Sequence, residues 1–243
     1  DLIGRPPAAL GSGPLLGSNN WVVSGDHTAS GLPLLANDPH LGIQMPSIWY
    51  EVGLHAPGWD VRGFSFAGIP GVIIGHNNRI AWGVTNVGPD VQDLYIEKIN
   101  PDNPNQYEYM GEWKDMNVIE EVIKVNGGED VVLQVRETIH GPIVSDVLED
   151  QPDALALRWT ANAGPSRILQ SVLSINQAQN FDEFREALRF WEIPSQNFVY
   201  ADVDGNIGYQ TPSLIPIRKS GQGMVPVPGW TDEYEWDGYV PFE

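Results

Sequence analysis

The sequence predicts an α+β protein that is mainly antiparallel β-structure with a few helices. Between residues 21 and 99, short β-prone runs alternate with Gly, Pro, Asn and Asp, which favour turns. A second β-rich section follows and extends to residue 139. Helical periodicity is confined to two stretches, at residues 166–177 and 181–191. Strands spaced in this way indicate a large antiparallel sheet.

The individual strands follow from these runs. In the first section we expect strands at residues 21–24, 34–36, 49–55, 61–66, 72–74, 80–85 and 93–99, with Gly25-Asp26 and Asn77-Asn78 as hairpin turns. The second section predicts strands at residues 107–110, 118–125 and 131–139, and Asn126-Gly127-Gly128 as the turn between the last two. Acidic residues cluster there, and we interpret them as solvated faces.

The second helix has the clearer signals. Phe181, Phe184 and Leu188 fall on one helical face, and Asn180 and Glu183 have the spacing of a capping box. Strands are expected again at 198–201 and 207–210, whereas the sequence from residue 212 onward is rich in Pro, Gly and Trp and has little periodicity. No internal repeat or long linker is found, so we expect residues 18–243 to form a single domain.

Composition excludes several function classes. The 32 acidic and 13 basic residues give a net charge of -19, which excludes a basic footprint for nucleic acid and disfavours anionic membranes. No apolar run approaches the ~20 residues of a membrane-spanning helix, and no signal peptide is visible. The absence of Cys excludes disulfides and thiolate zinc sites. An apolar fraction of 42% and nine Trp favour a packed globular protein.

Ser18 lies where a Gly-rich stretch, residues 10–17, meets the apolar run that begins at Trp21. A serine hydroxyl is a weak nucleophile until a base activates it. Cleavage of the Gly17–Ser18 bond would give Ser18 a free α-amine with a pKa of ~7.7–8.0, able to act as that base. Gly17 has no Cβ to obstruct attack on its carbonyl. Considered locally, a Gly-Ser junction is more typical of a linker than of a nucleophile.

The wider sequence contains several motifs in a fixed order. They are Gly17-Ser18-Asn19-Asn20-Trp21-Val22-Val23, Leu35-Ala36-Asn37-Asp38-Pro39-His40-Leu41-Gly42, Gly68-Ile69-Pro70-Gly71, Gly75-His76-Asn77, Ala81-Trp82-Gly83-Val84-Thr85-Asn86, Gln196-Asn197-Phe198-Val199-Tyr200-Ala201-Asp202 and Asp204-Gly205-Asn206-Ile207-Gly208-Tyr209. Together they resemble the penicillin acylase (penicillin amidase) family of N-terminal-nucleophile (Ntn) hydrolases. The resemblance implies part of an αββα sandwich, in which two antiparallel sheets are covered by helices. It also implies that residues 1–17 are a spacer remnant and that residues 18–243 are the N-terminal portion of the nucleophile-bearing β-subunit.

The resemblance implies roles for several residues. Ser18 would be the nucleophile, and a backbone N–H of Asn86 or Val87, with Val87 preferred, would bind the oxyanion. His40 would assist the Ser18 amine or orient a water molecule, although a His in this turn could instead simply bind backbone. A second oxyanion donor, an Asn side chain, is expected beyond Pro241-Phe242-Glu243. We therefore expect this chain by itself to be inactive, with the α-subunit and the remainder of the β-subunit as its partners.

Further residues are implied for the substrate and for calcium. Leu41, Ile74 and Val84 correspond to the acyl pocket, although core packing explains each equally well. Asp90 and Asp93 side chains and the carbonyls of Gln92 and Pro194 correspond to calcium ligands. On spacing alone, Asp-x-x-Asp is common on surfaces, so we expect weak or no calcium binding. No cofactor is expected for the chemistry.

The leading hypothesis is an amidohydrolase that cuts its own Gly17–Ser18 bond and then cleaves small acylated amines through an acyl-enzyme. Penicillins or cephalosporins, acyl-homoserine lactones and lipopeptides are the substrate types that the resemblance implies, in a periplasmic or secreted proenzyme. One alternative is a secreted β-rich carbohydrate-binding module, since nine Trp and eight Tyr would suit sugar stacking. Another is a glycosidase with two catalytic carboxylates, which the many acidic residues permit but do not specify.

Overall fold

The computed structural model describes residues 17–42, 44–148 and 151–243. Contacts divide the chain into two compact units. Unit 1 contains the described residues up to Gly88, residues 165–213 and residues 242–243, and unit 2 contains the described residues of 89–164 together with 214–241. The predicted spacer lies, except for Gly17, outside the described residues. The assignment of 18–243 to a single domain stays a prediction.

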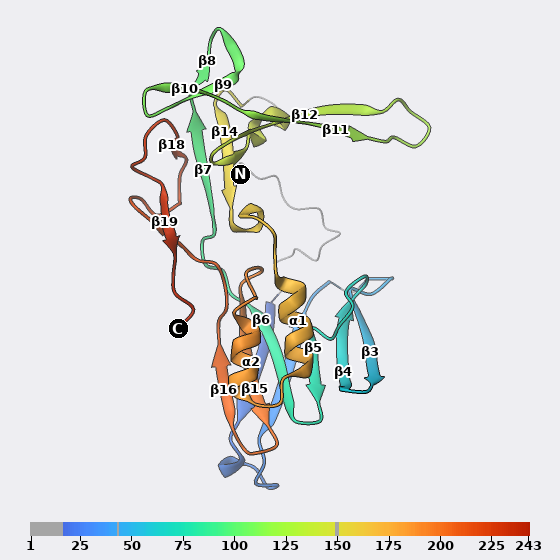
Figure 1. Ribbon diagram of the computed structural model, residues 1–243. Coiled ribbons are helices and arrows are strands. Elements are labelled where there is room, and N and C mark those ends of the chain that lie inside the picture. Colours follow the sequence, from blue (N-terminus) through green and yellow to red (C-terminus); the bar gives the residue numbers. More distant parts are fainter. Residues whose placement is uncertain (1–16, 43, 149–150) are drawn as a thin grey trace. The chain divides into compact units, whose positions relative to one another are not determined.

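A six-stranded sheet forms the centre of unit 1 (Figure 1). Its order is β16-β15-β6-β5-β4-β3 and every pair is antiparallel, as predicted. The strands are β3 (Trp49–Ala56), β4 (Trp59–Phe66), β5 (Ile74–Asn77), β6 (Ile80–Asn86), β15 (Gln196–Asp202) and β16 (Ile207–Gln210). The remaining strands of unit 1, β1 (Gly17–Val23) and β2 (Leu34–His40), form a separate antiparallel ribbon.

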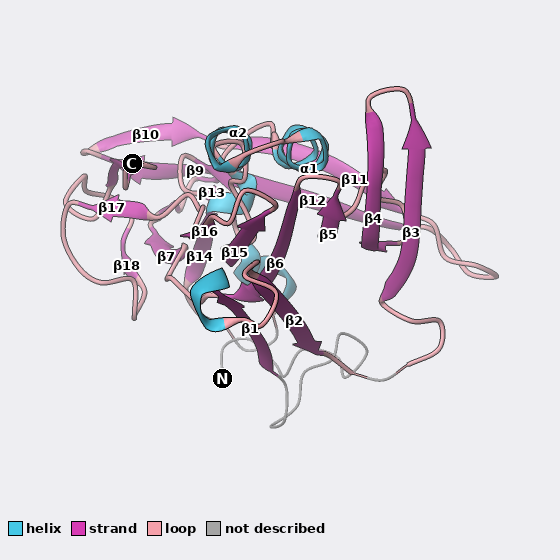
Figure 2. Cartoon of the chain, turned by 90° about the horizontal axis from the view of Figure 1, so that it is seen from below, coloured by secondary structure: helices cyan, strands magenta, loops and turns pink. Residues whose placement is uncertain are grey.

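Unit 1 has three layers, because alternate residues of β6 face opposite sides of the sheet. Trp82 belongs to a buried core with Phe184 of α2 (Phe181–Leu188) and with residues of α1 (Ile168–Gln177). The next residue, Gly83, faces the ribbon, where a Cβ would lie 2.8 Å from the Cβ of Asn37. Figure 2 shows the helices on one side of β6 and β15 and the ribbon on the other.

Helix α2 begins at its predicted cap. The Asn180 Oδ1 accepts a hydrogen bond from the Glu183 N–H at 2.9 Å. The Glu183 carboxylate returns to the N–H of Gln179 at 2.9 Å, one residue before the cap, so the box is displaced by one position. Both helices are shorter than predicted. Helix α1 begins at residue 168 rather than 166, and helix α2 ends at residue 188 rather than 191.

Two of the predicted turns are confirmed and one is wrong. Asn77 ends β5 and its Oδ1 accepts from the N–H groups of Arg79 and Ile80, so the hairpin turn to β6 consists of Asn78 and Arg79, one residue beyond the predicted pair. Gly127 has φ of 76° in the turn between β11 (Asn117–Ile123) and β12 (Val131–Thr138). Gly25-Asp26 is not a hairpin turn: it belongs to a 3-10 helix, Gly25–His27, capped by Ser24, because the Ser24 hydroxyl accepts from the Asp26 N–H.

Unit 2 consists of small sheets. Their orders are β10-β9-β8, β11-β12-β13, β14-β7-β18 and β17-β19. The strands are β7 (Gln92–Glu97), β8 (Ile99–Asn100), β9 (Asn103–Tyr109), β10 (Glu112–Asp115), β11 (Asn117–Ile123), β12 (Val131–Thr138), β13 (Gly141–Pro142), β14 (Ala154–Trp159), β17 (Pro216–Arg218), β18 (Val227–Pro228) and β19 (Trp236–Tyr239). The sequence did not predict β10, β13, β14 or β17 to β19. Within the described ranges, no helix is long and apolar enough to span a membrane.

Candidate active site

Ser18 is the second residue of β1 and is half-buried. Its hydroxyl donates a hydrogen bond to the Gly17 carbonyl oxygen at 2.6 Å. The Oγ atom therefore lies beside the carbonyl group of the Gly17–Ser18 bond, the predicted cleavage site. Ser18 is paired with Pro39 of β2, and residues directly opposite in an antiparallel pair project to the same face.

A cavity of about 500 Å³ opens beside Ser18 in unit 1. Its walls are mainly apolar and come from the ribbon, the six-stranded sheet and the helical segment. The lining residues are Ser18, Pro39, Leu41, Ile48, Trp49, Phe66, Ile69, Ile73, Val84, Thr85, Asn86, Ile168, Leu169, Val172, Trp191, Ile193, Pro194 and Gln196. Trp49 stacks on Phe66 with ring centroids 4.2 Å apart. The site therefore presents a serine hydroxyl to a space suited to an apolar group.

The predicted pocket residues have different positions. Leu41 and Val84 line the cavity, whereas Ile74 does not. Ile74 begins β5 opposite Phe64 and is 7% exposed in the core, and its neighbour Ile73 lines the cavity instead. Adjacent residues of an extended chain project to opposite sides, so an assignment displaced by one residue selects the wrong side chain.

The two candidate oxyanion donors differ in direction. The Val87 N–H donates to the Ser195 carbonyl at 3.4 Å, toward β15. Hydrogen-bonded and non-hydrogen-bonded pairs alternate along an antiparallel ladder, so Asn86, which is opposite Gln196, directs its N–H away from β15. On that other edge β5 pairs with β6 only at Ala81 and Trp82, and Asn86 lines the cavity.

His40 is not brought together with Ser18. It follows Pro39 in β2, and therefore projects to the face opposite Ser18. There its Nε2 lies 2.9 Å from Asp38 Oδ2, in a pair exposed to solvent. The described contacts of the His40 ring are with this carboxylate, and His40 is not among the residues that line the cavity.

The residues assigned to calcium do not form a cation site as they are arranged here. Asp93 is 5% exposed, and its Oδ2 accepts from Arg218 Nε at 2.8 Å and also from the Trp236 indole N–H. The other end of the same guanidinium lies 3.4 Å from Asp90 Oδ2. Arg218 thus supplies the positive charge between both carboxylates, and no group of three His, Asp or Glu with metal-site geometry occurs among the described residues.

The two remaining calcium candidates have other structural contacts. Gln92 pairs with Trp159 in β7 and β14 of unit 2. Pro194 belongs to unit 1, where its carbonyl oxygen accepts from the Trp191 indole N–H at 2.6 Å.

Sequence reasoning missed several cavity residues, above all Gln196, whose Nε2 donates to Asn86 Oδ1 at 2.6 Å. Gln196 opens one of the motifs that carry the family resemblance, which was the available signal. Trp49, Phe66 and Trp191 were also missed, because an aromatic residue in a β-rich sequence is most often a core residue.

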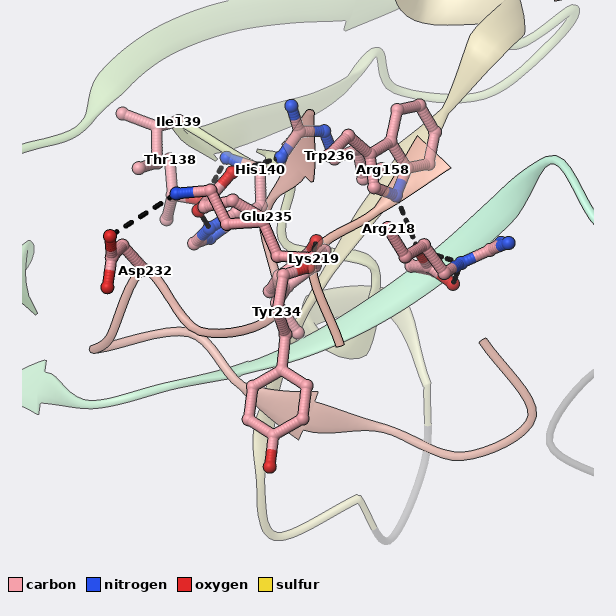
Figure 3. A network of polar contacts seen from close by, with 12 residues as sticks. Thr138, Ile139, His140, Arg158, Arg218, Lys219, Asp232, Tyr234, Glu235 and Trp236 are labelled. Carbon is pink, nitrogen blue, oxygen red and sulfur yellow. Dashed lines mark hydrogen bonds and ion pairs between the residues drawn. The ribbon is translucent and has the colours of Figure 1, made fainter. Parts of the chain in front are cut away.

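Unit 2 contains a buried charged network that the sequence did not predict (Figure 3). The ring of His140 is held between Glu97 and Glu235, with both nitrogens 2.7 Å from carboxylate oxygens, and it stacks on Tyr95 at 3.9 Å. Burial alone lowers the pKa of His140, but hydrogen bonds to Glu235 and Glu97 outweigh it and the pKa is raised. Arg158 pairs with the other oxygen of Glu235.

Comparison with known proteins relates this chain to a family. The sequence profile described as penicillin amidase matches residues 4–243. Acyl-homoserine lactone acylase QuiP of Pseudomonas aeruginosa is 33% identical over 97% of this chain, which covers 29% of that protein. Penicillin acylase 2 proenzyme of Pseudomonas sp. (strain SE83) is 34% identical over 93% of this chain, which again covers 29% of the relative.

A solved structure agrees with the sequence comparisons. The thermostable penicillin G acylase from Alcaligenes faecalis matches with a TM-score of 0.82 and 35% identity, over 93% of this chain and 40% of that one. The chain thus spans less than a third of the length of the two curated relatives named above. The structural match confirms the predicted fold class, of which unit 1 shows a helical layer, the large sheet and the ribbon. This chain belongs to the penicillin amidase family.

Proposed function

We propose that this protein is an amidohydrolase that cleaves small acylated amines, with Ser18 as its N-terminal nucleophile. The observation that carries the proposal is the position of one hydroxyl. Ser18 Oγ lies against the Gly17 carbonyl at 2.6 Å from its oxygen and at the wall of an apolar cavity. This position supports two acyl transfers by the same atom, first from its own chain and then from a substrate.

The first transfer would release the nucleophile. Ser18 Oγ attacks the Gly17 carbonyl carbon, its proton passes to the Ser18 nitrogen, and the C–N bond breaks as an ester forms. Water then hydrolyses the ester and leaves a Gly17 carboxylate and a free Ser18 amine. This amine, with a pKa of ~7.7–8.0 in an unperturbed chain, is the base that the hydroxyl previously lacked.

The second transfer would use that amine. It takes the proton of the Ser18 hydroxyl while Oγ attacks the substrate's acyl carbon, and it returns the proton to the departing amine. Water hydrolyses the resulting ester and releases the acid. The Asn86 N–H, which faces away from β15, is the better placed of the two candidate oxyanion donors. Loss of one such donor typically costs ~2.7–4 kcal/mol of transition-state stabilisation.

The cavity supports an apolar acyl group as the part of the substrate that it holds. Its volume is about 500 Å³, and Thr85, Asn86, Gln196 and Ser18 are its polar lining residues. A charged acyl group would lose its hydration there without a partner of opposite charge among those residues. The relatives include acylases for acyl-homoserine lactones and penicillins, so the proposal specifies the acyl side and leaves the amine open.

Intact-mass measurement on the full-length protein tests the proposal. The wild type is expected to yield a chain that starts at Ser18 and to take up a sulfonyl fluoride on that residue. Ser18→Ala is expected to remain uncut and unlabelled. A Ser18→Ala protein that is still cut between residues 17 and 18 would refute self-cleavage by this hydroxyl.

Other parts of the proposal rest on the family resemblance alone. They are an α-subunit and the remainder of the β-subunit as partners, a periplasmic or secreted location, and maturation from a proenzyme. Inactivity of the present chain by itself belongs to the same group.

A further inference from the structure

Asn37 joins the ribbon that carries Ser18 to the strand that carries Asn86. Its Oδ1 accepts a hydrogen bond from the Val84 N–H at 2.9 Å, and its Nδ2 donates to the Val84 carbonyl at 2.8 Å. The same Nδ2 lies 3.3 Å from the carbonyl oxygen of Asn19, the residue after Ser18. We infer that Asn37 is a positioning residue that sets the distance between the nucleophile and its oxyanion donor. This inference rests on the proposed function.

Asn37 binds β6 at a point where β5 no longer pairs with it. β5 pairs with β6 only at Ala81 and Trp82. Beyond these residues, Val84 is opposite Phe198 in a pair of the type that directs its N–H and C=O away from β15. The Asn37 carboxamide meets both groups in the place of a strand residue. A buried backbone N–H or C=O without a hydrogen-bond partner costs free energy, so the Val84 backbone groups favour this position of the Asn37 carboxamide.

Gly83 makes the approach possible. A Cβ at this position would lie 2.8 Å from Asn37 Cβ and 2.9 Å from its carboxamide carbon, closer than real Cβ contacts. Asn20, on the same face of the ribbon as Asn37, adds a second attachment by donating to the Asn197 carbonyl at 3.3 Å. The ribbon is thus held through two carboxamides. Asn20 Nδ2 also lies 3.5 Å from the Gly83 carbonyl oxygen of β6, whereas Asn37 bonds both backbone groups of Val84, two residues from Asn86.

The position of this carboxamide connects it to the chemistry. Asn37 contacts backbone one residue from Ser18 and two residues from Asn86. A shift of the ribbon along or away from β6 would therefore change the separation of attacking oxygen and oxyanion donor directly. Displacements of about 1 Å in such a geometry can reduce turnover about 100-fold.

The same unit supplies a matched control. Asn176 of α1 makes the same pair of bonds to Val72, accepting from its N–H at 2.8 Å and donating to its carbonyl at 2.7 Å. Asn176 is 2% exposed and does not line the cavity. Asn176→Ala should therefore lower the melting temperature at least as much as Asn37→Ala, without altering the catalytic geometry.

The experiment measures melting temperature, kcat and KM for an N-acyl p-nitroanilide, and labelling of Ser18 by phenylmethylsulfonyl fluoride, in the full-length protein. Asn37→Ala is expected to lower kcat about 10- to 100-fold with KM changed less than about 3-fold, since it alters positioning rather than binding. Asn176→Ala is expected to keep kcat within about 3-fold of wild type. Gly83→Ala, which keeps the carboxamide but displaces it, should reproduce the fall in kcat and serves if Asn37→Ala does not mature.

Two outcomes would overturn the inference and can be told apart. If wild type takes up the label at Ser18 but Asn37→Ala or Gly83→Ala keeps its kcat, or Asn176→Ala loses as much, Asn37 is structural only. If wild type takes up no label at Ser18, the proposed function fails and the inference fails with it.

Discussion

His140 is the residue whose surroundings most clearly link charge to stability. Its side chain is fully buried between Glu97 and Glu235, with Arg158 beyond Glu235, Tyr95 stacked on one face and Tyr109 at its edge. A buried ion pair is retained only when hydrogen bonds satisfy its members, and breaking it by removing one partner is strongly destabilising. The charge on His140 is therefore part of the folding of unit 2.

The pH dependence of unfolding tests this arrangement. The folded pKa of His140 is raised from 6.5, so its contribution is complete below pH 6.5 and is lost as pH rises through the folded pKa. For Glu235, burial raises the pKa but hydrogen bonds from His140 and Arg158 lower it below 4.5, so that contribution is lost only at more acidic pH. Urea midpoints of the wild type should therefore fall on raising pH above neutrality, and those of His140→Gln should be lower and flatter. Parallel profiles for the two proteins would contradict the assignment.

At the scale of elements, helix α2 shows how a short sequence signal sets a boundary. Asn180 caps the helix by accepting from the Glu183 N–H, and Phe184 and Leu188 are fully buried on one face. The cap fixes the first residue of the helix, and with it the face on which Phe184 and Leu188 pack against the sheet. The C-terminal end of helix α2 has no such signal. Beyond it, residues 189–191 form hydrogen bonds between residues three apart, such as that from the Trp191 N–H to the Leu188 carbonyl.

Removal of the cap should have a moderate cost. Asn180→Ala is expected to reduce the free energy of unfolding by about 1 kcal/mol, because the Glu183 N–H loses its acceptor. Asn180→Ser keeps a side-chain oxygen as acceptor and adds no charge beside the Glu183 carboxylate, so it should be nearly neutral, which makes it the matched control. Both values can be read from urea denaturation of the same chain. Equal losses for the two variants would show that the side-chain amide, rather than its oxygen, stabilises the helix.

At the scale of the whole molecule, the two compact units have different kinds of core. Unit 1 is built on one large sheet whose apolar residues, with those of α1 and α2, form its core, and all the cavity residues belong to it. Unit 2 has a smaller apolar cluster, centred on Tyr95, Ile143 and Ala156, and depends more on buried ion pairs. One of these ion pairs joins the Arg218 guanidinium to the Asp93 carboxylate, and the same guanidinium also lies near the Asp90 carboxylate.

Calcium should consequently have little effect on this chain. With Arg218 between Asp90 and Asp93, adding calcium or a chelator is expected to leave the melting temperature unchanged. Arg218→Met removes the guanidinium and leaves Asp93 buried and unpaired by a cation, at a cost of about 3–5 kcal/mol. The control is Lys219→Met, whose partner Asp232 is exposed, with an expected cost below about 1 kcal/mol. A rise in melting temperature of the wild type with calcium would show that the carboxylates accept a metal ion despite Arg218.

Local signals in the sequence were sufficient for much of the fold. Alternating and β-branched residues located most strands of unit 1, and Asn180 located the start of α2, because these features act within a few residues. β14 was missed, since Ala154–Trp159 combines small and apolar residues that do not alternate clearly. β17 to β19 are four residues or fewer and depend on their partners, so their sequence carries little periodicity.

The sequence by itself determined the family, the antiparallel character of the fold and the singling out of Ser18, because these are written in ordered motifs and in local residue preferences. Only the tertiary structure decided which groups accompany Ser18. His40 projects to the opposite face, Ile73 rather than Ile74 reaches the cavity, and Asn86 rather than Val87 directs its N–H away from β15. Each of these depends on strand pairing and register, and Gln196, the partner of Asn86 in that pairing, is 110 residues away in the chain.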